Sequence, residues 1–143
     1  MGKILGIDHG SKRIGIALSD ESNTIAFPKD IIETGGKYLN IIAEFVKSND
    51  VSTVVIGYPL NMKGEMSKQT EVVSDFIDQL REILPEKIEL VKWDERLTSK
   101  MAESFVIDSG MKKKKRQDKS NLDTLSAVFI LQSYLDRRPP MKS

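Results

Sequence analysis

The order of the short apolar segments is the feature that most limits how this chain can fold. Residues 4–7 and 14–18 form apolar or alternating runs, and the polar turn between them contains Gly10, so they predict a β-hairpin. A third strand is expected at residues 25–32, where Pro28 indicates an edge strand or a bulge. The chain therefore opens with three meandering strands.

Segments with apolar residues at helical spacing alternate with short apolar runs through the rest of the chain. The expected helices cover residues 38–46, 67–84, 99–109 and 121–137, and the expected strands cover residues 51–56 and 88–93. Asn121 is a residue type that caps the start of a helix. The sequence thus predicts an α/β fold in which a mixed five-stranded sheet is flanked by helices.

Length and composition favour one globular domain outside the membrane. A chain of 143 residues with 39% hydrophobic and 30% charged residues is typical of a single domain, which we expect to cover residues 1–143. No run of about 18 apolar residues is present to span a membrane, and the first strand reaches Asp8 too early for a signal peptide. The absence of cysteine excludes disulfides and thiolate metal sites. We expect a cytoplasmic location without membrane contact.

Positive charge is concentrated in one short segment. Residues 112–119 contain six basic side chains and one acidic one, a local net charge of +5; because the whole chain carries +1, the remainder carries −4. The candidate phosphate contacts in this segment are Lys112, Lys113, Lys114, Lys115 and Arg116. We predict a mobile loop near residues 110–120 that contacts a nucleic-acid backbone, although a solvated loop without a ligand has the same composition.

Acidic residues end two of the expected strands. Asp8 lies on the same strand face as Ile4, and a carboxylate at a buried strand end needs an ion partner, a hydrogen bond or a metal. The alternative is an aspartate that caps the turn. Asp94 and Glu95 end the last expected strand, and alternation does not decide which of them points inward. The alternative there is a solvated turn paired with Arg96.

A third acid, Asp123, falls in the first turn of the last expected helix. It precedes Ala127 and Ile130 on the apolar face, although the helix dipole also favours acids there. Acids at two strand ends and one helix start form an oxygen cage suited to Mg²⁺ or Mn²⁺ and to phosphoryl transfer. The lone histidine, His9, could assist, but a single histidine in a turn is more often simply exposed.

Four motifs resemble, in order and separation, those of YqgF (RuvX-like) proteins. The first runs from Asp8 to Ala17 and on to Ser19-Asp20, and the second is Gly57-Tyr58-Pro59-Leu60-Asn61 with Gly64. The third is Asp94-Glu95-Arg96-Leu97-Thr98, and the fourth joins Asp123 to Ser126-Ala127. Together they cover nearly the whole chain, whereas the first motif alone also resembles the phosphate loop of actin-like kinases and ATPases.

This resemblance implies an RNase H-like fold and a metal-dependent nuclease that processes the 5′ end of pre-16S ribosomal RNA, with Holliday-junction resolution as the rival activity. It implies that Asp8, Glu95 and Asp123 are catalytic and hold Mg²⁺ or Mn²⁺. The strand at residues 54–56 ends in Gly57. Many RNase H-like relatives have an acid there, so the second acid must come from residues 94–95.

Further residues are expected to contact the nucleic acid. Besides the basic segment, these are Lys12, Arg13, Tyr58, Asn61 and Arg96. A strand that ends in Gly-x-Pro forces the chain to turn at the carboxyl edge of the sheet, where ligands of α/β folds gather. The alternative for residues 58–61 is a rigid structural turn.

Several alternatives remain on the sequence alone. A non-catalytic RNA-binding module of ribosome assembly would keep the fold and the basic loop without cleaving. An actin-like ATPase is disfavoured because 143 residues supply only one of the two subdomains that it needs. RNA against DNA as the substrate is not decided, because the acids act on a phosphodiester and phosphate contacts carry no direct sequence information. The choice between a monomer and a weak homodimer is also open: a symmetric junction cut calls for a two-fold dimer, whereas a monomer could trim a ribosomal precursor.

Overall fold

A five-stranded mixed sheet forms the centre of the molecule. The computed structural model describes residues 2–10, 12–61, 63–95 and 119–137, with the backbone alone for residues 119–124. The strands are β1 (Lys3–His9), β2 (Arg13–Ser19), β3 (Ala26–Glu33), β4 (Val51–Tyr58) and β5 (Glu89–Asp94), in the spatial order β3-β2-β1-β4-β5. The pairs β3-β2 and β2-β1 are antiparallel, and the pairs β1-β4 and β4-β5 are parallel. The predicted α/β fold with a mixed five-stranded sheet is confirmed.

The edge strand β3 carries the irregularity that its proline predicts. Ile16 of β2 is paired with Asp30, whereas the next residue, Ala17, is paired with Pro28, so the register skips Lys29. Proline lacks the N–H that a ladder needs and is therefore found at edges and bulges. Both the edge position and the bulge expected from Pro28 occur.

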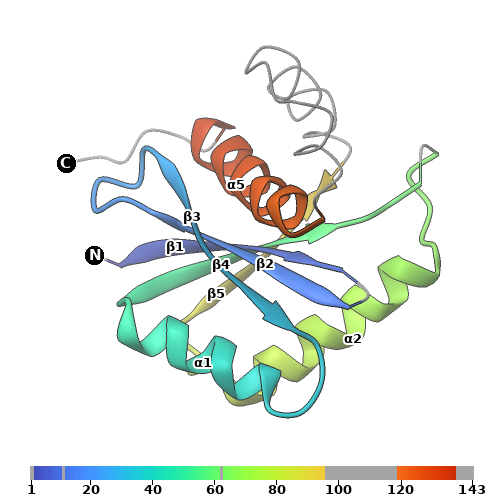
Figure 1. Ribbon diagram of the computed structural model, residues 1–143, viewed down its shortest axis with the longest axis horizontal. Helices are drawn as coiled ribbons and strands as arrows, with labels where there is room; N and C mark the ends of the chain where they lie inside the picture. Colours follow the sequence, from blue (N-terminus) through green and yellow to red (C-terminus); the bar gives the residue numbers. More distant parts are fainter. Residues whose placement is uncertain (1, 11, 62, 96–118, 138–143) are drawn as a thin grey trace.

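Among the described residues, three helices cover the two faces of the sheet. α1 (Tyr38–Ser48) and α2 (Lys68–Ile83) lie on one face, and α5 (Lys119–Arg137) lies on the other (Figure 1). The sheet is therefore the middle layer of three.

In the part of the chain that the structure describes, no helix combines the length and apolarity needed to cross a membrane.

Alternation along the strands divides the core into two clusters. Leu5 and Ile7 of β1 belong to the cluster under α1 and α2, whereas Ile4 belongs to the cluster under α5. Because successive side chains of a strand point to opposite faces, Gly6 and Asp8 share the α5 face with Ile4. The face on which Asp8 lies is thus fixed by the packing of its strand.

The start of α2 is tied to the ends of two strands. Ser67 and Thr70 form a capping box, in which each side chain bonds to the backbone N–H of the other. The Thr70 hydroxyl also donates to the carbonyl of Pro59, just after β4, and Gln69 donates to the carbonyl of His9, the last residue of β1, over 3.0 Å. These bonds hold the first turn of α2 against the carboxyl edge of the sheet.

Two helix expectations have different outcomes. The last helix begins at Lys119, so Asn121 lies inside it instead of capping it, and Asp123 is past its first turn. The expectation was wrong because Lys119 and Ser120 are compatible with a helical backbone, and a cap-type residue alone does not stop a helix from starting earlier. The short helix expected at residues 99–109 lies outside the described residues.

Candidate active site at the carboxyl end of the parallel strands

Asp8 and Glu95 meet on the α5 face of the sheet. Asp8 is half-buried near the end of β1, and Glu95, also half-buried, directly follows β5. The side chains of Asp8 and Glu95 are hydrogen-bond partners. The order of the strands has therefore brought together two acids that are far apart in the sequence.

The carboxyl of Glu95 holds its proton more firmly than an exposed carboxyl does. Burial raises the pKa of Glu95 above its ordinary value, the hydrogen bond with Asp8 offsets part of this rise, and the negative charge of Asp94 adds to it. Positive charge placed between the two carboxyls would favour their ionised forms. Two ionised carboxylates are therefore disfavoured at this site unless a cation lies beside them.

The structure separates the two adjacent acids. Glu95 lies on the strand face of Trp93, which packs toward α5. Asp94 lies on the opposite strand face with Leu90, which packs against the core under α1 and α2. Glu95 is thus the acid beside Asp8, while Asp94 acts on it through charge.

Asp123, the third predicted acid, lies on α5. The helix touches β1 at Gly6, where an added Cβ would stand 3.1 Å from the carbonyl oxygen of Ala127. Further along, Gln132 bonds to the backbone of Ala26, which is level with the amino end of β1, so the helix runs antiparallel to β1. Asp123 is one turn before Ala127 and on the same stripe, at the end of α5 nearest the carboxyl end of β1. Its side chain lies outside the described residues.

The donor set is of the kind that a hard divalent cation prefers. Mg²⁺ and Mn²⁺ take oxygen ligands, and Asp8 and Glu95 present carboxylate oxygens at one point. Among the side chains that the structure describes, no group of three or more His, Cys, Asp or Glu residues gathers, and the carboxylate of Asp123 is not among them. The described part of the site therefore supplies two of the three predicted ligands.

A glycine lies directly beneath Glu95. Gly57 in β4 is buried, and a Cβ added to it would stand 2.5 Å from Oε1 of Glu95 and 2.5 Å from Cδ1 of Ile130 in α5. The sequence predicted only a turn at this residue and missed the contact. The available signal was that a glycine, which has no side chain, directly follows the apolar run of this strand.

Tyr58 and Asn61 are both engaged in the fold after β4. The hydroxyl of Tyr58 is 2.7 Å from Oγ of Ser74 in α2, and the ammonium of Lys92 lies 5.0 Å from the centre of the Tyr58 ring. Oδ1 of Asn61 accepts hydrogen bonds from two backbone N–H groups of its own loop, each 2.9 Å away. These contacts give both residues a structural role, and their contact with nucleic acid stays a prediction.

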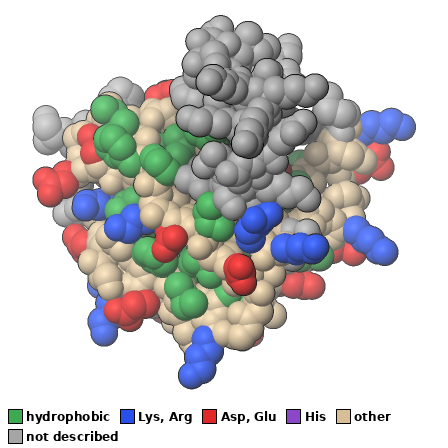
Figure 2. Space-filling model, in the orientation of Figure 1, with side chains coloured by type: hydrophobic (Ala, Val, Ile, Leu, Met, Phe, Trp, Pro, Cys, Tyr) green, Lys and Arg blue, Asp and Glu red, His purple; other side chains and the backbone are tan. Residues whose placement is uncertain are grey.

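The predicted basic contacts divide into two groups. Lys12 is exposed and Arg13 is half-buried at the turn between β1 and β2, next to the strand end that carries Asp8. Arg96, Lys112, Lys113, Lys114, Lys115 and Arg116 lie outside the described residues. On the face drawn in Figure 2, the described acidic and basic side chains are interspersed. That face of the described part therefore gives no single-sign surface for a phosphate backbone.

His9 belongs to the core and not to the acidic site. Its side chain is 8% exposed, and its ring centre lies 4.5 Å from that of Phe76 and 6.5 Å from that of Tyr38. Burial lowers the pKa of His9, and its Nδ1 has no hydrogen-bond partner among the described residues. The expectation of an exposed histidine is wrong, because alternation turns His9 to the face opposite Asp8.

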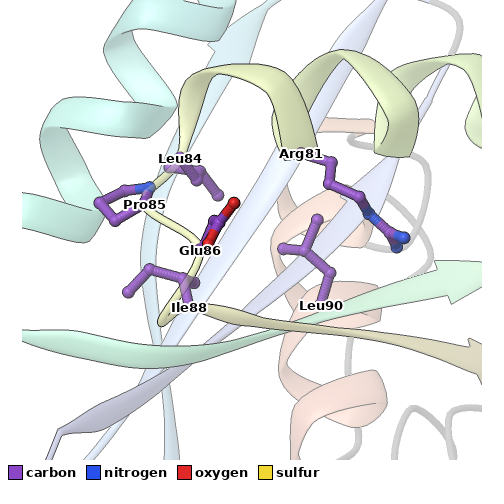
Figure 3. Close-up of a pocket in the computed structure, with 6 residues that line it drawn as sticks. All are labelled: Arg81, Leu84, Pro85, Glu86, Ile88 and Leu90. Atoms are coloured by element: carbon purple, nitrogen blue, oxygen red, sulfur yellow. The ribbon is translucent and has the colours of Figure 1, made fainter.

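The cavity drawn in Figure 3 lies away from the carboxylate pair. It has a volume of about 440 Å³ and lies between the end of α2 and the start of β5. Its lining consists of Arg81, Leu84, Pro85, Glu86, Ile88 and Leu90. Because Glu95 follows the opposite end of β5, this cavity is not part of the candidate site.

A family model covers the strands and helices that form this site. The model described as "RuvX: Holliday junction resolvase" matches residues 2–137. The chain belongs to the RuvX family. A relative of this RuvX chain from Sulfurihydrogenibium sp. (strain YO3AOP1), named "Putative pre-16S rRNA nuclease", is 42% identical over 137 residues, which is 96% of this chain and 92% of the relative. The family predicted from the motifs is confirmed, and its members' names place the RuvX chain among nucleic-acid hydrolases, as predicted.

Solved structures share the fold of this RuvX chain. RuvC of T. thermophilus in complex with a Holliday junction substrate aligns with a TM-score of 0.56 and 11% identity, covering 99% of this chain and all of the other. The fowlpox virus resolvase in complex with Holliday junction DNA aligns with a TM-score of 0.55 and 13% identity, covering 94% and 97% of the two chains. The predicted RNase H-like fold is thereby confirmed.

Proposed function

We propose that this RuvX-family chain is a divalent-metal-dependent nuclease that cleaves a phosphodiester bond of pre-16S ribosomal RNA at the Asp8–Glu95 site. One observation carries the proposal: the carboxyl of Asp8, near the end of β1, meets that of Glu95, just after β5. Holding two acids together and half-buried is costly unless a cation or a reaction uses them. The family consists of nucleases, and cleavage of a phosphodiester is a reaction that would use the two acids.

The proposed metal ligands are Asp8, Glu95 and Asp123, and the proposed ion is Mg²⁺ or Mn²⁺. Bound there, the ion supplies activation of the attacking water and stabilisation of the leaving oxygen. Asp8 and Glu95 would present carboxylate oxygens from the ends of β1 and β5. Asp94 adds negative charge beside Glu95, which favours a cation at that carboxylate.

The substrate backbone is proposed to lie across the carboxyl edge of the sheet. Its proposed contacts are Lys12, Arg13, Tyr58, Asn61, Arg96, Lys112, Lys113, Lys114, Lys115 and Arg116. Lysine and arginine contacts to phosphate position a nucleic acid without reading its sequence. The choice of cleavage site would therefore depend on the shape of the precursor.

Pre-16S RNA is preferred as the substrate because a relative with 42% identity over nearly the full length carries that name. A four-way DNA junction is the second candidate, favoured by the description of the family model. Cutting a junction symmetrically calls for a two-fold dimer, whereas trimming a precursor does not. We expect a monomer or a weak homodimer.

The experiment offers the full chain both substrates in parallel. A pre-16S RNA fragment with its 5′ extension and a four-way DNA junction are incubated with Mg²⁺, Mn²⁺ or EDTA, beside an RNA duplex of unrelated sequence. We expect metal-dependent cleavage in the 5′ extension and little cleavage of the unrelated duplex. If the DNA junction were cleaved faster than the RNA, junction DNA would replace pre-16S RNA as the proposed substrate. Binding of both substrates without cleavage in either metal would overturn the proposal in favour of a non-catalytic RNA-binding module.

A further inference from the structure

Glu95 reaches Asp8 only by crossing β4. In the sheet, β4 lies between β1 and β5, and neighbouring strands are about 4.8 Å apart. The side chain of Glu95 must therefore extend over the width of β4 to share a hydrogen bond with Asp8. Ile56 of β4 is level with Ile7 of β1, so the next residue, Gly57, is level with Asp8 and lies in this path.

The missing side chain of Gly57 leaves the space that Glu95 occupies. A Cβ on Gly57 would be 2.5 Å from Oε1 and 3.1 Å from Cδ of Glu95, and 2.5 Å from Cδ1 of Ile130. Such separations are shorter than carbon and oxygen atoms tolerate without displacement. Gly57 is not among the residues with positive φ, so the requirement here is for space and not for an unusual backbone conformation.

We infer that Gly57 is a positioning residue of the site, whose lack of a side chain allows the acid after β5 to take the place that an acid on β4 would fill. The inference rests on the proposed function, in which Glu95 is a metal ligand. Gly57 lies on the α5 face at the row of Asp8, so a carboxylate there would be a direct neighbour of Asp8. With glycine at this position, Glu95 brings its carboxylate to the same row.

Gly57 could also serve a purely structural role, which must be distinguished from making space for Glu95. Its added Cβ would also collide with Ile130, so glycine could serve only to let α5 approach the sheet. Gly6 supplies the matched comparison: its added Cβ would stand 2.7 Å from Cβ of Leu131 and meets no carboxylate. Gly6→Ala therefore disturbs the same helix without touching Glu95.

The first experiment measures metal affinity in a background that removes the collision with the helix. Ile130→Val lacks Cδ1, so Gly57→Ala in this background collides with Glu95 alone. Titrating Mg²⁺ or Mn²⁺ against the melting temperature gives the affinity, because a ligand of the folded state raises that temperature by mass action. Adding Gly57→Ala to Ile130→Val should weaken affinity roughly 10- to 100-fold, as loss of a group that orients a ligand does. Gly6→Ala also presses on α5, which carries Asp123, but does not meet Glu95, so it should lower the melting temperature and weaken affinity much less than Gly57→Ala does. Equal affinity with and without Gly57→Ala would overturn the inference.

The second experiment needs no metal and no activity. The drop in melting temperature caused by Gly57→Ala is compared in the Ile130→Val background and in that background with Glu95→Ala. We expect a smaller drop when the Glu95 side chain is absent, whereas Gly6→Ala should cost the same in both. Equal drops would refute a contact between Gly57 and Glu95. If the native protein neither bound metal nor cleaved nucleic acid, the proposed function would fail, and this cycle would still decide the role of Gly57.

Discussion

Two neighbouring residues at the end of β1 serve opposite faces of the sheet. Asp8 meets the carboxyl of Glu95 under α5, whereas His9 is buried against Phe76 of α2. In both cases burial disfavours the charged form, which raises the pKa of Glu95 and lowers that of His9. Their effects on stability therefore have opposite dependence on pH.

Glu95 should make the metal-free protein less stable as the pH rises. Because its pKa is raised in the folded state, folding favours its protonated form, and this stabilisation is lost as the pH rises from the ordinary carboxyl value of 4.5 through the raised pKa. Glu95→Gln is neutral throughout and should remove that part of the slope. Urea unfolding in EDTA across this range measures it. An identical slope in the two proteins would show that Glu95 has no raised pKa.

His9 should have the reverse effect. Its pKa is lowered by burial, so folding favours the neutral ring, and stability is lost as the pH falls below the ordinary value of 6.5 and through the lowered pKa. His9→Leu keeps an apolar side chain against Phe76 and cannot take up a proton. We expect the variant to lose less stability than native protein between about pH 7 and about pH 5, measured by thermal melts. An equal loss would contradict the burial of His9.

The sequence could predict the strand face of a single side chain only where neighbouring residues of the same strand determine it. Asp8 could be assigned to the strand face of Ile4 because the apolar run continues without a break up to that residue. Alternation could not choose between Asp94 and Glu95, because the choice depends on which face of β5 packs toward α5. The sequence could not predict the contact of Gly57 with Glu95 either, because Gly57 in β4 and Glu95 after β5 are far apart in the chain.

Elements were predicted well where apolar periodicity defines them. All five strands and the helices α1 and α2 occur where the pattern placed them, and Pro28 marked both an edge and a bulge. The start of α5 was placed two residues late, because a cap-type residue such as Asn121 does not by itself stop a helix from beginning earlier. The strand order, which brings Asp8 and Glu95 together, depends on long-range pairing that periodicity does not contain.

The basic segment is an element whose role can be tested by salt. Lys112, Lys113, Lys114, Lys115 and Arg116 are five adjacent cations, which repel one another unless an anion is bound. Replacing all five by Ala should weaken nucleic-acid binding, and each lost phosphate contact should reduce the slope of log K against log salt by about 0.9 on duplex DNA. Binding isotherms at several salt concentrations measure this slope. An unchanged slope would leave the segment as solvated surface.

At the scale of the whole molecule, the three-layer arrangement explains why the site lies where it does. The parallel strands β1, β4 and β5 end at the same edge, and the first turn of α2 is bonded to the chain at the ends of β1 and β4. α5 crosses the other face with the turn of Asp123 directed toward that edge. That the chain forms one domain over residues 1–143 stays a prediction, which limited proteolysis can test.

The most direct measurement of the central claim is the rate of Mg²⁺- or Mn²⁺-dependent cleavage of nucleic acid by four single variants. Asp8→Asn, Glu95→Gln and Asp123→Asn each remove one proposed ligand charge while keeping the side-chain shape, so each should abolish cleavage without unfolding the protein. Asp94→Asn is the matched control, because it neutralises the acid next to Glu95 that lies on the other strand face. It should retain most of the activity. Full activity in the first three variants, or loss of activity in Asp94→Asn with normal activity in Glu95→Gln, would contradict the account.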